Sequence, residues 1–360
     1  MQESPPVAAQ APLLLPAGGT RLLVILPALN EAVTIQAVIG RIPRAIPGID
    51  RVEVLVVDDG STDETAALSR AAGASVISHG KNRGVGAAMQ TGLDEAVRRE
   101  VSFAVNIDSD GQFAPEDIPT LLQPLIDGKT DFATASRFKD PKLVPVMPTV
   151  KRFGNWGMAR MVSSIVGQRF DDVSCGFRAY TREALLQLVL SGAFTYTQEM
   201  LLVLGQKGLR MVEVPMVVRG VREHGQSRVA SNLFRYASRT SKIIFSCVRD
   251  FSPGTFFNLA SLLLVLLALA FFTFFVVHRI VAGMFTPHIW AGFTSAFLFG
   301  LSFMTFSLGQ VAAMVARIRR IQDRELYLLR KYLDRSTAAE RQAAAAVSAS
   351  ASASAQDGTG

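Results

Sequence analysis

Cysteine is scarce in this sequence of 360 residues, and the shortage excludes one class of protein at the outset. Cys175 and Cys247 are the only two cysteines, too few for the disulfide framework of a small secreted domain. Neither cysteine has the spacing of a metal ligand. The first 19 residues lack the basic start and the cleavage site of a secretory signal, so we expect them to form a disordered leader.

Acidic residues are also in the minority. The 37 Lys and Arg residues outnumber the 30 Asp and Glu residues, which gives a formal net charge of +7 and a pI of about 9.7. Such an excess predicts an anionic partner, either nucleic acid, a membrane surface or a phosphorylated substrate. No DNA- or RNA-binding signature accompanies the basic residues, so we expect no nucleic-acid partner.

Two long apolar runs lie near the carboxyl end. Residues 256–278 carry no formal charge, and residues 289–316 hold Gln310 as their one strongly polar side chain. Each run is as long as the roughly 20 residues that cross a bilayer, so the pair (256–316) predicts a transmembrane hairpin; a buried core helix is the alternative. Basic residues flank the hairpin on both sides. The positive-inside rule then predicts a multi-pass protein of the inner (cytoplasmic) membrane with both termini in the cytoplasm.

The segments beside the hairpin differ in composition. Residues 229–255 mix aromatic side chains with Arg and Lys, as amphipathic helices lying along lipid headgroups do. Residues 317–336 are rich in Arg, which predicts a basic cytoplasmic helix. Residues 337–360 are rich in Ala, Ser and Gln, and we expect a disordered tail there.

Strand-like and helix-like patterns alternate between residues 20 and 228. Apolar runs are separated by helical segments that begin near Glu31 and after Thr62. The alternation predicts an α/β domain with a mostly parallel sheet and helices on both faces. The expected strands cover residues 22–26, 52–57, 101–107 and 132–135, with a short one near Val76.

Two aspartates one residue apart follow the expected strand 101–107. Asp108 and Asp110 should emerge at the carboxyl edge of the sheet, where open α/β sheets bind ligands. Carboxylate oxygens prefer hard cations, so the pair predicts a site for Mg²⁺ or Mn²⁺ that would in turn bind a diphosphate. An acidic turn that caps the following helix is the alternative.

Two further strand ends deliver polar groups to the same edge. Asn30 and Glu31 follow the first strand, and Asp58 ends the second, where its carboxylate can accept hydrogen bonds from a base or a ribose. Plain helix caps are the alternative. Acidic strand ends gathered in one crevice repel one another unless a cation or a donor-rich ligand lies among them.

A glycine-rich run, HGKNRGVGAAM, follows the expected strand near Val76. A dinucleotide fingerprint should follow the first strand and have glycine or alanine at its sixth position, where this run has Met89. We therefore interpret the run as a turn that brings its backbone and Lys81 or Arg83 toward phosphates. A plain strand-to-helix turn is the alternative.

The motifs occur in the order LPALNE, VVDDGSTD, NRGVGAAM, DSDGQF, ASRF, SCGFRAY, EM, EVP and REHGQSR, and two apolar spans follow. In this order and spacing the sequence, from about Arg21 to Asp334, resembles the family 2 inverting glycosyltransferases and, within them, the polyprenyl-phosphate glycosyltransferases. The resemblance implies a GT-A-like nucleotide-sugar-binding domain over residues 20–228, followed by an interfacial helix and the hairpin. It also implies a UDP- or GDP-sugar donor, a polyprenyl phosphate acceptor and a divalent cation.

The resemblance further implies roles for individual residues. The donor is expected to contact residues at the sheet edge, namely Pro27, Ala28, Asn30, Glu31, Asp58, Lys81, Gly86, Asp108 and Ser109. The expected metal ligands are Asp108, Asp110 and Gln112. The expected phosphate contacts are Arg137, Arg222, Ser227 and Arg228, with Asp110, Arg137 and Arg228 acting in catalysis. A salt bridge at a strand end is the alternative for Arg137, and a basic loop near anionic lipid is the alternative for residues 222–228.

The acceptor determines whether a catalytic base is needed. A lipid phosphate has a second pKa of about 6, so it is largely ionised and needs no base. A hydroxyl acceptor would need one, and Asp171, Asp172 and Glu199 are the candidates. Two rival functions stay open: a glycolipid or polysaccharide synthase that uses a hydroxyl acceptor, and a non-catalytic membrane adaptor with a nucleotide fold. A homo-oligomer formed through the hairpins is a further open expectation.

Overall fold

The computed structural model describes residues 19–144, 149–190, 196–218, 253–284 and 288–357, together with residues 245, 249 and 286. The chain divides into two compact units. The sheet unit comprises Met1–Arg228 and Tyr327–Gly360, and the hairpin unit comprises Val229–Leu326. The expected interfacial segment 229–255 lies almost wholly outside the described residues.

Seven strands form one sheet in the order β3-β2-β1-β4-β6-β5-β7. Strand β6 runs antiparallel to both its neighbours, and the other four strand pairs are parallel, so the expected mostly parallel α/β sheet is confirmed. Strands β6 and β7 lie outside the strands that the sequence pattern predicted. The bounds are β1 (Arg21–Ala28), β2 (Arg51–Asp58), β3 (Ser75–Ser78), β4 (Phe103–Asn106), β5 (Phe132–Ser136), β6 (Arg178–Thr181) and β7 (Met211–Pro215).

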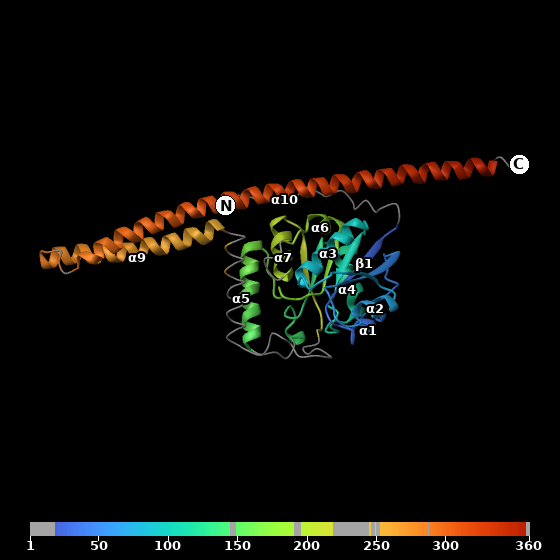
Figure 1. Cartoon of the computed structure of the whole chain (residues 1–360), viewed down its shortest axis with the longest axis horizontal. Coiled ribbons are helices and arrows are strands. Elements are labelled where there is room, and N and C mark those ends of the chain that lie inside the picture. The colour runs from blue at the N-terminus through green and yellow to red at the C-terminus, as the bar shows by residue number, and fades with distance from the viewer. Residues whose placement is uncertain are drawn as a thin grey trace. The chain divides into compact units, whose positions relative to one another are not determined.

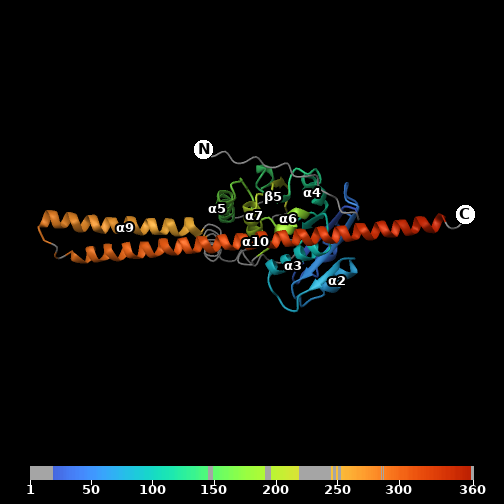
Figure 2. The ribbon, with the colours of Figure 1, turned by 90° about the horizontal axis from the view of Figure 1, so that it is seen from above.

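Helices cover both faces of the sheet, as Figures 1 and 2 show for α3 and α4. Leu22, Val24 and Leu26 of β1 face the side covered by α1 and α4, whereas Ile25 faces α3, whose Gly92 lies against it. The helix bounds are α1 (Ile35–Gly40), α2 (Thr65–Ala71), α3 (Val85–Arg98), α4 (Ile118–Ile126), α5 (Thr149–Val166), α6 (Arg182–Gln187) and α7 (Tyr196–Gln206), with 3-10 turns at Pro115–Asp117 and Pro141–Leu143.

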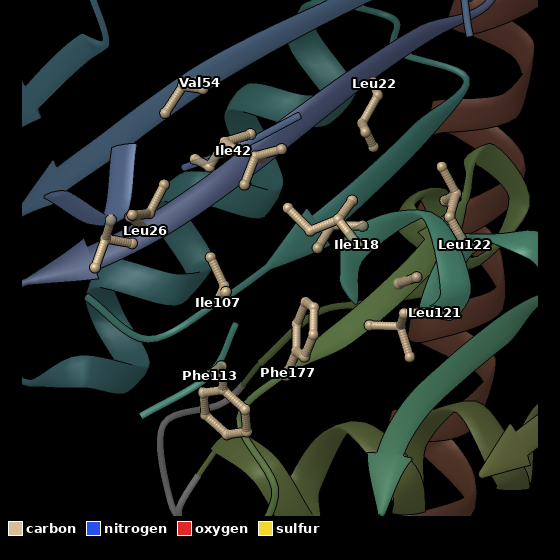
Figure 3. Packing of buried hydrophobic residues seen from close by; sticks show 14 of the residues in the cluster. Leu22, Leu26, Ile42, Val54, Ile107, Phe113, Ile118, Leu121, Leu122 and Phe177 are labelled. Atoms are coloured by element: carbon tan, nitrogen blue, oxygen red, sulfur yellow. The ribbon is translucent and has the colours of Figure 1, made fainter. Parts of the chain in front are cut away.

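The main hydrophobic core lies between the sheet and the helices α1 and α4 (Figure 3). Leu121 and Leu122 of α4 are fully buried there, and the rings of Phe113 and Phe177 lie 5.5 Å apart between their centroids. Burying each such side chain stabilises the fold by roughly 1.5–3 kcal/mol. Because Phe113 and Phe177 belong to the segments that follow Asp110 and Gly176, this packing also fixes the loops at the carboxyl edge of the sheet.

Two apolar helices dominate the hairpin unit. Helix α9 (Pro253–Ala282) and the first part of α10 (Ile289–Asp357) are long and apolar enough to cross a membrane, with mean hydropathies of 2.8 and 1.6 over the candidate spans. The Ser261 and Ser302 hydroxyls lie 2.9 Å apart between them, and Ser295 Oγ donates to the carbonyl of Ala268 at 3.0 Å. The two helices expected at residues 256–278 and 289–316 are therefore present as candidate spans.

Helix α10 continues well past the apolar span. Its backbone is helical to Asp357, which differs from the disordered tail expected over residues 337–360. The run is rich in alanine, the residue with the highest intrinsic helix propensity, and the expectation gave too little weight to that propensity. Within the sheet unit, residues from Tyr327 onward contact α6: Tyr327 Oη donates to Glu183 Oε1 at 2.5 Å, and Arg182 forms an ion pair with Asp334.

Candidate active site at the carboxyl edge of the sheet

The register of three strands brings the predicted acidic residues to one edge of the sheet. Ala28 of β1 pairs with Asp58 of β2, and Ile25 of β1 pairs with Asn106 of β4. The Ile107 N–H donates to the Ile25 carbonyl at 3.1 Å, which extends the pairing to the residue before Asp108. The ends of β1, β2 and β4 therefore meet at one edge of the sheet, the edge at which α/β sheets bind ligands.

Hydrogen bonds between loops fix the first part of this edge. Ser109 Oγ donates to the Pro27 carbonyl at 2.9 Å, and Thr34 Oγ1 donates to the Ser109 carbonyl at 2.8 Å. The hydroxyl of Ser109 therefore joins β1 to the acidic turn. Glu31 belongs to the same cluster, because its Oε2 lies 3.2 Å from Thr34 Oγ1.

Asn30 links the first two strand ends. Its backbone has φ of 55°, a left-handed conformation that Asn adopts more readily than most residues. Its N–H donates to Ser61 Oγ at 2.9 Å, and its Oδ1 accepts the Thr62 N–H at 2.8 Å. Asp58 lies on the other side of this link, where its Oδ1 accepts the Ser61 N–H at 3.0 Å and the residue is 5% exposed.

The acidic pair itself is held by backbone and side-chain donors. Asp110 is 6% exposed, and its Oδ1 accepts the backbone N–H of Gln112 at 3.1 Å. Asp108 Oδ1 accepts a hydrogen bond from Tyr196 Oη at 3.3 Å. Burial, followed by the charge of Asp108, raises the pKa of the Tyr196 hydroxyl well above its ordinary value, so Tyr196 is a permanent donor to this carboxylate.

Gly176 leaves room for Asp108. A Cβ atom at position 176 would lie 2.5 Å from Asp108 Oδ2 and 2.9 Å from Oδ1, closer than real Cβ atoms come. The two carboxylates, the Gln112 amide and this bare backbone suit a hard cation that takes its remaining ligands from a diphosphate and water. Over the described ranges, no group of three or more His, Cys, Asp or Glu side chains is placed to hold a metal ion.

Arg137 is bound to Asp172. Its Nε lies 2.6 Å from Asp172 Oδ2 and its Nη2 lies 2.9 Å from Oδ1, a two-pronged pair in which the Asp172 side chain is fully buried. Burial favours a lower pKa for the guanidinium, but the hydrogen bonds and charge of Asp172 outweigh it and hold the pKa of Arg137 above its ordinary value. This is the strand-end salt bridge that we gave as the alternative role for Arg137.

Glu213 of β7 anchors the loop that carries Asp172. Its Oε1 accepts the Asp172 N–H at 2.7 Å and the Asp171 N–H at 3.0 Å. Burial raises the pKa of Glu213, and the backbone donors offset part of that rise. The EVP motif therefore has a positioning role, which pattern reasoning did not assign to it.

A basic and aromatic pocket of about 500 Å³ lies beside the Arg137–Asp172 pair. Arg152, Trp156 and Arg160 recur every four residues on one face of α5, and the Arg160 guanidinium lies 5.9 Å from the Trp156 ring centroid. Trp156 is 56% exposed. The lining is Phe138, Pro141, Val144, Arg152, Asn155, Trp156, Ala159, Arg160, Ser163, Arg169, Phe170 and Asp171. Sequence reasoning missed this pocket, although the spacing of the α5 arginines and tryptophan was a signal for it.

The remaining predicted residues have other positions. Lys81 is exposed in the loop after β3, and Gly86 lies in the first turn of α3. Arg222, Ser227 and Arg228 lie outside the described residues. Cys175 is buried, and burial raises the pKa of its thiol to about 12, which makes it a packing residue rather than a nucleophile.

Comparisons with known proteins agree with this geometry. The family described as "Glycosyl transferase family 2" matches residues 23–189. The chain is 33% identical over 236 residues to polyprenol monophosphomannose synthase of Mycolicibacterium smegmatis, with 60% of this chain and 84% of the relative covered. It is 29% identical over 222 residues to undecaprenyl-phosphate mannosyltransferase of Micrococcus luteus (59% and 89% covered). Glucosyl-3-phosphoglycerate synthase of M. tuberculosis is a structural neighbour, with a TM-score of 0.50, 25% identity, and 64% of this chain and 80% of that chain covered.

Proposed function

The chain belongs to glycosyl transferase family 2, and on this premise we propose that it moves one sugar from a nucleotide-sugar donor to a polyprenyl phosphate at a membrane. One observation supports this most strongly. The chain combines an acidic pair at the sheet edge, an arginine-lined pocket of α5 whose lining includes Phe138 and Asp171, the neighbours of the Arg137–Asp172 pair, and two candidate membrane spans. These features support a site for the donor and a separate, basic site for an anionic lipid acceptor.

We propose that the nucleoside of a UDP- or GDP-sugar binds between the ends of β1 and β2. Asp58 supplies a carboxylate that accepts hydrogen bonds from base or ribose donors, and the Asn30 link to Thr62 holds the two strand ends together. Lys81 and Arg83 on the neighbouring loop are exposed cations that favour an anionic donor.

Asp108, Asp110 and Gln112 would hold Mg²⁺ or Mn²⁺, which when bound supplies Lewis-acid neutralisation of a leaving diphosphate. Two hydrogen-bond donors of the chain orient the carboxylates of this site. Tyr196 Oη orients Asp108, and the Gln112 N–H orients Asp110. Because these contacts fix the orientation of both carboxylates, the carboxylates need little rearrangement when the donor binds.

The pocket of α5 suits the acceptor phosphate. Arg152, Arg160 and Arg169 offer planar donor groups for phosphate oxygens, and Trp156 with Phe138 offers apolar surface for the first part of a lipid chain. An acceptor phosphate oxygen would attack the anomeric carbon as the bond from that carbon to the nucleoside diphosphate breaks. The phosphate is already ionised, so no proton has to be removed.

The candidate catalytic bases named from the sequence differ in whether an acceptor can reach them. Asp172 is fully buried and committed to Arg137, so it is not available to deprotonate a hydroxyl. Asp171 lines the pocket and forms an ion pair with Arg169 at 3.3 Å. Glu199 of α7 is 1% exposed, so Asp171 is the candidate most open to a hydroxyl acceptor, and this keeps the glycolipid-synthase alternative testable.

The hairpin would keep the enzyme beside its insoluble acceptor. Arg317, Arg319, Arg320 and Arg324 follow the second apolar span, and the positive-inside rule then favours a cytoplasmic position for them. We therefore propose that the sheet unit works at the cytoplasmic leaflet, with residues 20–228 as the catalytic domain.

The decisive experiment compares two acceptors that differ only in the phosphate. Membranes containing the protein are incubated with radiolabelled UDP- and GDP-sugars and either polyprenyl phosphate or the matching polyprenol. We expect label in the lipid fraction with the phosphate alone. Label with the polyprenol, lost in an Asp171→Asn variant, would instead identify a hydroxyl acceptor.

A further inference from the structure

Asp59, the second acid of the DDGS motif, joins two loops. The residue is 3% exposed, and its carboxylate accepts three hydrogen bonds from the loop after β3. The donors are His79 Nδ1 at 2.8 Å, the Arg83 N–H at 2.9 Å and the Gly84 N–H at 2.7 Å. One buried side chain thus gathers both ends of residues 79–84, here the 79–84 loop.

The loop is pressed against the residues that follow β2. The His79 N–H donates to the Asp58 carbonyl at 2.8 Å. Gly60 has φ of 79°, and a Cβ there would lie 2.7 Å from the Lys81 carbonyl carbon and 2.8 Å from the Asn82 nitrogen. The 79–84 loop therefore packs next to Asp58, and any shift of the loop changes the space beside the Asp58 side chain.

A helix residue holds the other side of the His79 ring. His79 Nε2 lies 3.0 Å from Thr91 Oγ1 of α3, and Thr91 Oγ1 donates its one proton to the Ala87 carbonyl at 3.0 Å. Asp59 accepts a hydrogen bond from Nδ1 on the opposite side of the ring. The His79 side chain, 6% exposed, is therefore held between Asp59 and Thr91.

We propose that the chain of contacts from Asp59 through His79 to Thr91 is a positioning device for the donor nucleoside. The device sets how far the 79–84 loop, with the exposed cations Lys81 and Arg83, stands from Asp58. It acts through the loop and makes no contact with the reacting atoms. It therefore controls the affinity for the donor and the choice of the donor's nucleobase rather than the rate of transfer. This inference rests on the proposed nucleotide-sugar donor.

Two pairs of variants separate positioning from general stability. His79→Leu removes both ring nitrogens, and Thr91→Val removes the hydroxyl beside Nε2. By contrast, His79→Asn keeps an N–H donor near the Nδ1 position, and Thr91→Ser keeps the hydroxyl. Asp131→Asn is the control. Asp131 is 5% exposed and accepts Arg210 Nη2 at 2.9 Å, but it lies at the start of β5, at the opposite edge of the sheet.

The full-length protein in detergent is titrated calorimetrically with UDP and with GDP, and donor KM and kcat are measured on the same samples. Loss of one hydrogen bond from this chain of contacts should raise Kd and donor KM about tenfold in His79→Leu and Thr91→Val, while kcat stays within about twofold. His79→Asn and Thr91→Ser should regain most of the affinity. Asp131→Asn should lower Tm and leave KM unchanged.

The remaining outcomes contradict either the positioning proposal alone or the proposed donor as well. If the wild type binds a nucleoside diphosphate and Thr91→Val binds it equally well, the positioning proposal is wrong and the proposed function stands. The same holds if all variants lose affinity in proportion to Tm, the Asp131→Asn control included. If the wild type binds neither UDP nor GDP, the proposed donor is wrong and the positioning proposal falls with it. Should His79→Leu fail to fold, the Thr91→Val and Thr91→Ser pair decides.

Discussion

Gly176 and Asp108 approach each other so closely that a methyl group on Gly176 would lie 2.5 Å from Asp108 Oδ2. The two residues come from different strands, since Asp108 follows β4 and Gly176 precedes the antiparallel β6. The position of the first acidic residue is therefore set from two sides, by Tyr196 Oη and by the bare backbone of Gly176.

Gly176→Ala should displace the Asp108 carboxylate and lower kcat about a hundredfold, because a shift of about 1 Å at a reacting site costs that much. The fold should survive, since the atom that must move is the end of a side chain. The measurement is the transfer rate together with Tm.

Gly40→Ala is the matched control for this change. Gly40 ends α1, and a Cβ there meets nothing within 4 Å. We expect normal activity and a Tm equal to or above that of the wild type, since alanine favours helix more than glycine does. A Gly176→Ala enzyme as active as Gly40→Ala would show that Asp108 need not stay in place.

The Arg137–Asp172 pair allows structural and catalytic roles to be separated. Arg137→Met leaves a fully buried carboxylate unpaired, so we expect the free energy of unfolding to fall by about 3 kcal/mol. The double variant Arg137→Met/Asp172→Leu removes both charges and should recover much of that loss. Chemical denaturation measures both.

Activity of the double variant then reveals the second role. If Arg137 also binds a phosphate, as the sequence analysis predicts, the double variant should be stable and still transfer sugar at least about tenfold more slowly than the wild type. Wild-type transfer by the double variant would reduce Arg137 to the salt bridge alone.

The arginines of the α5 pocket should affect the acceptor and not the donor. Arg152→Ala is expected to raise the KM for polyprenyl phosphate about tenfold, the value of one charge-assisted hydrogen bond, with donor KM unchanged. Arg51→Ala is the control, because Arg51 has a 71% exposed side chain at the start of β2, away from the pocket. Equal acceptor KM values for the two variants would move the acceptor site elsewhere.

The contact between α6 and the carboxyl part of α10 should respond to pH through Glu183. Burial favours a higher pKa for Glu183, but hydrogen bonds from Tyr327, Lys331 and Gln187 outweigh it and hold the pKa below its ordinary value of 4.5. A carboxyl group with a lowered folded-state pKa stabilises the fold above pH 4.5, and this contribution is lost as the pH falls through the folded-state value.

Comparison of Tm between the wild type and Glu183→Gln tests this. The wild type should be the more stable protein at pH 6 to 7, and the difference should shrink below about pH 4.5. A Tm difference that is constant from pH 7 to pH 3 would mean that the Glu183 charge contributes nothing to docking.

Sequence patterns predicted the part of this fold that depends on local periodicity. The strands from residue 21 to residue 136, the acidic turn at Asp108 and the two apolar spans all follow from apolar runs that end at polar residues. Short strands such as β6 (Arg178–Thr181) escaped, because four residues carry too little periodic signal and β6 includes a fully buried arginine.

The contacts that hold the site were beyond local reasoning. Asp59 and His79 are 20 residues apart, and Glu213 and Asp172 are 41 apart, so only the strand order brings them together. Asp58 and Asp59 are adjacent in the VVDDGSTD motif, and local pattern does not distinguish their roles. The structure separates them, since Asp58 binds the Ser61 N–H at the strand ends and Asp59 is committed to the 79–84 loop.

In the proposed function, the carboxylates of Asp108 and Asp110 bind the donor diphosphate through a divalent cation. The most direct measurement is transfer of a radiolabelled sugar to polyprenyl phosphate by the wild type and by Asp110→Ala, each with Mn²⁺ or with excess chelator, in samples of equal Tm. Of the four samples, we expect transfer only in the wild type with Mn²⁺. Full transfer by Asp110→Ala, or by the wild type in excess chelator, would contradict it.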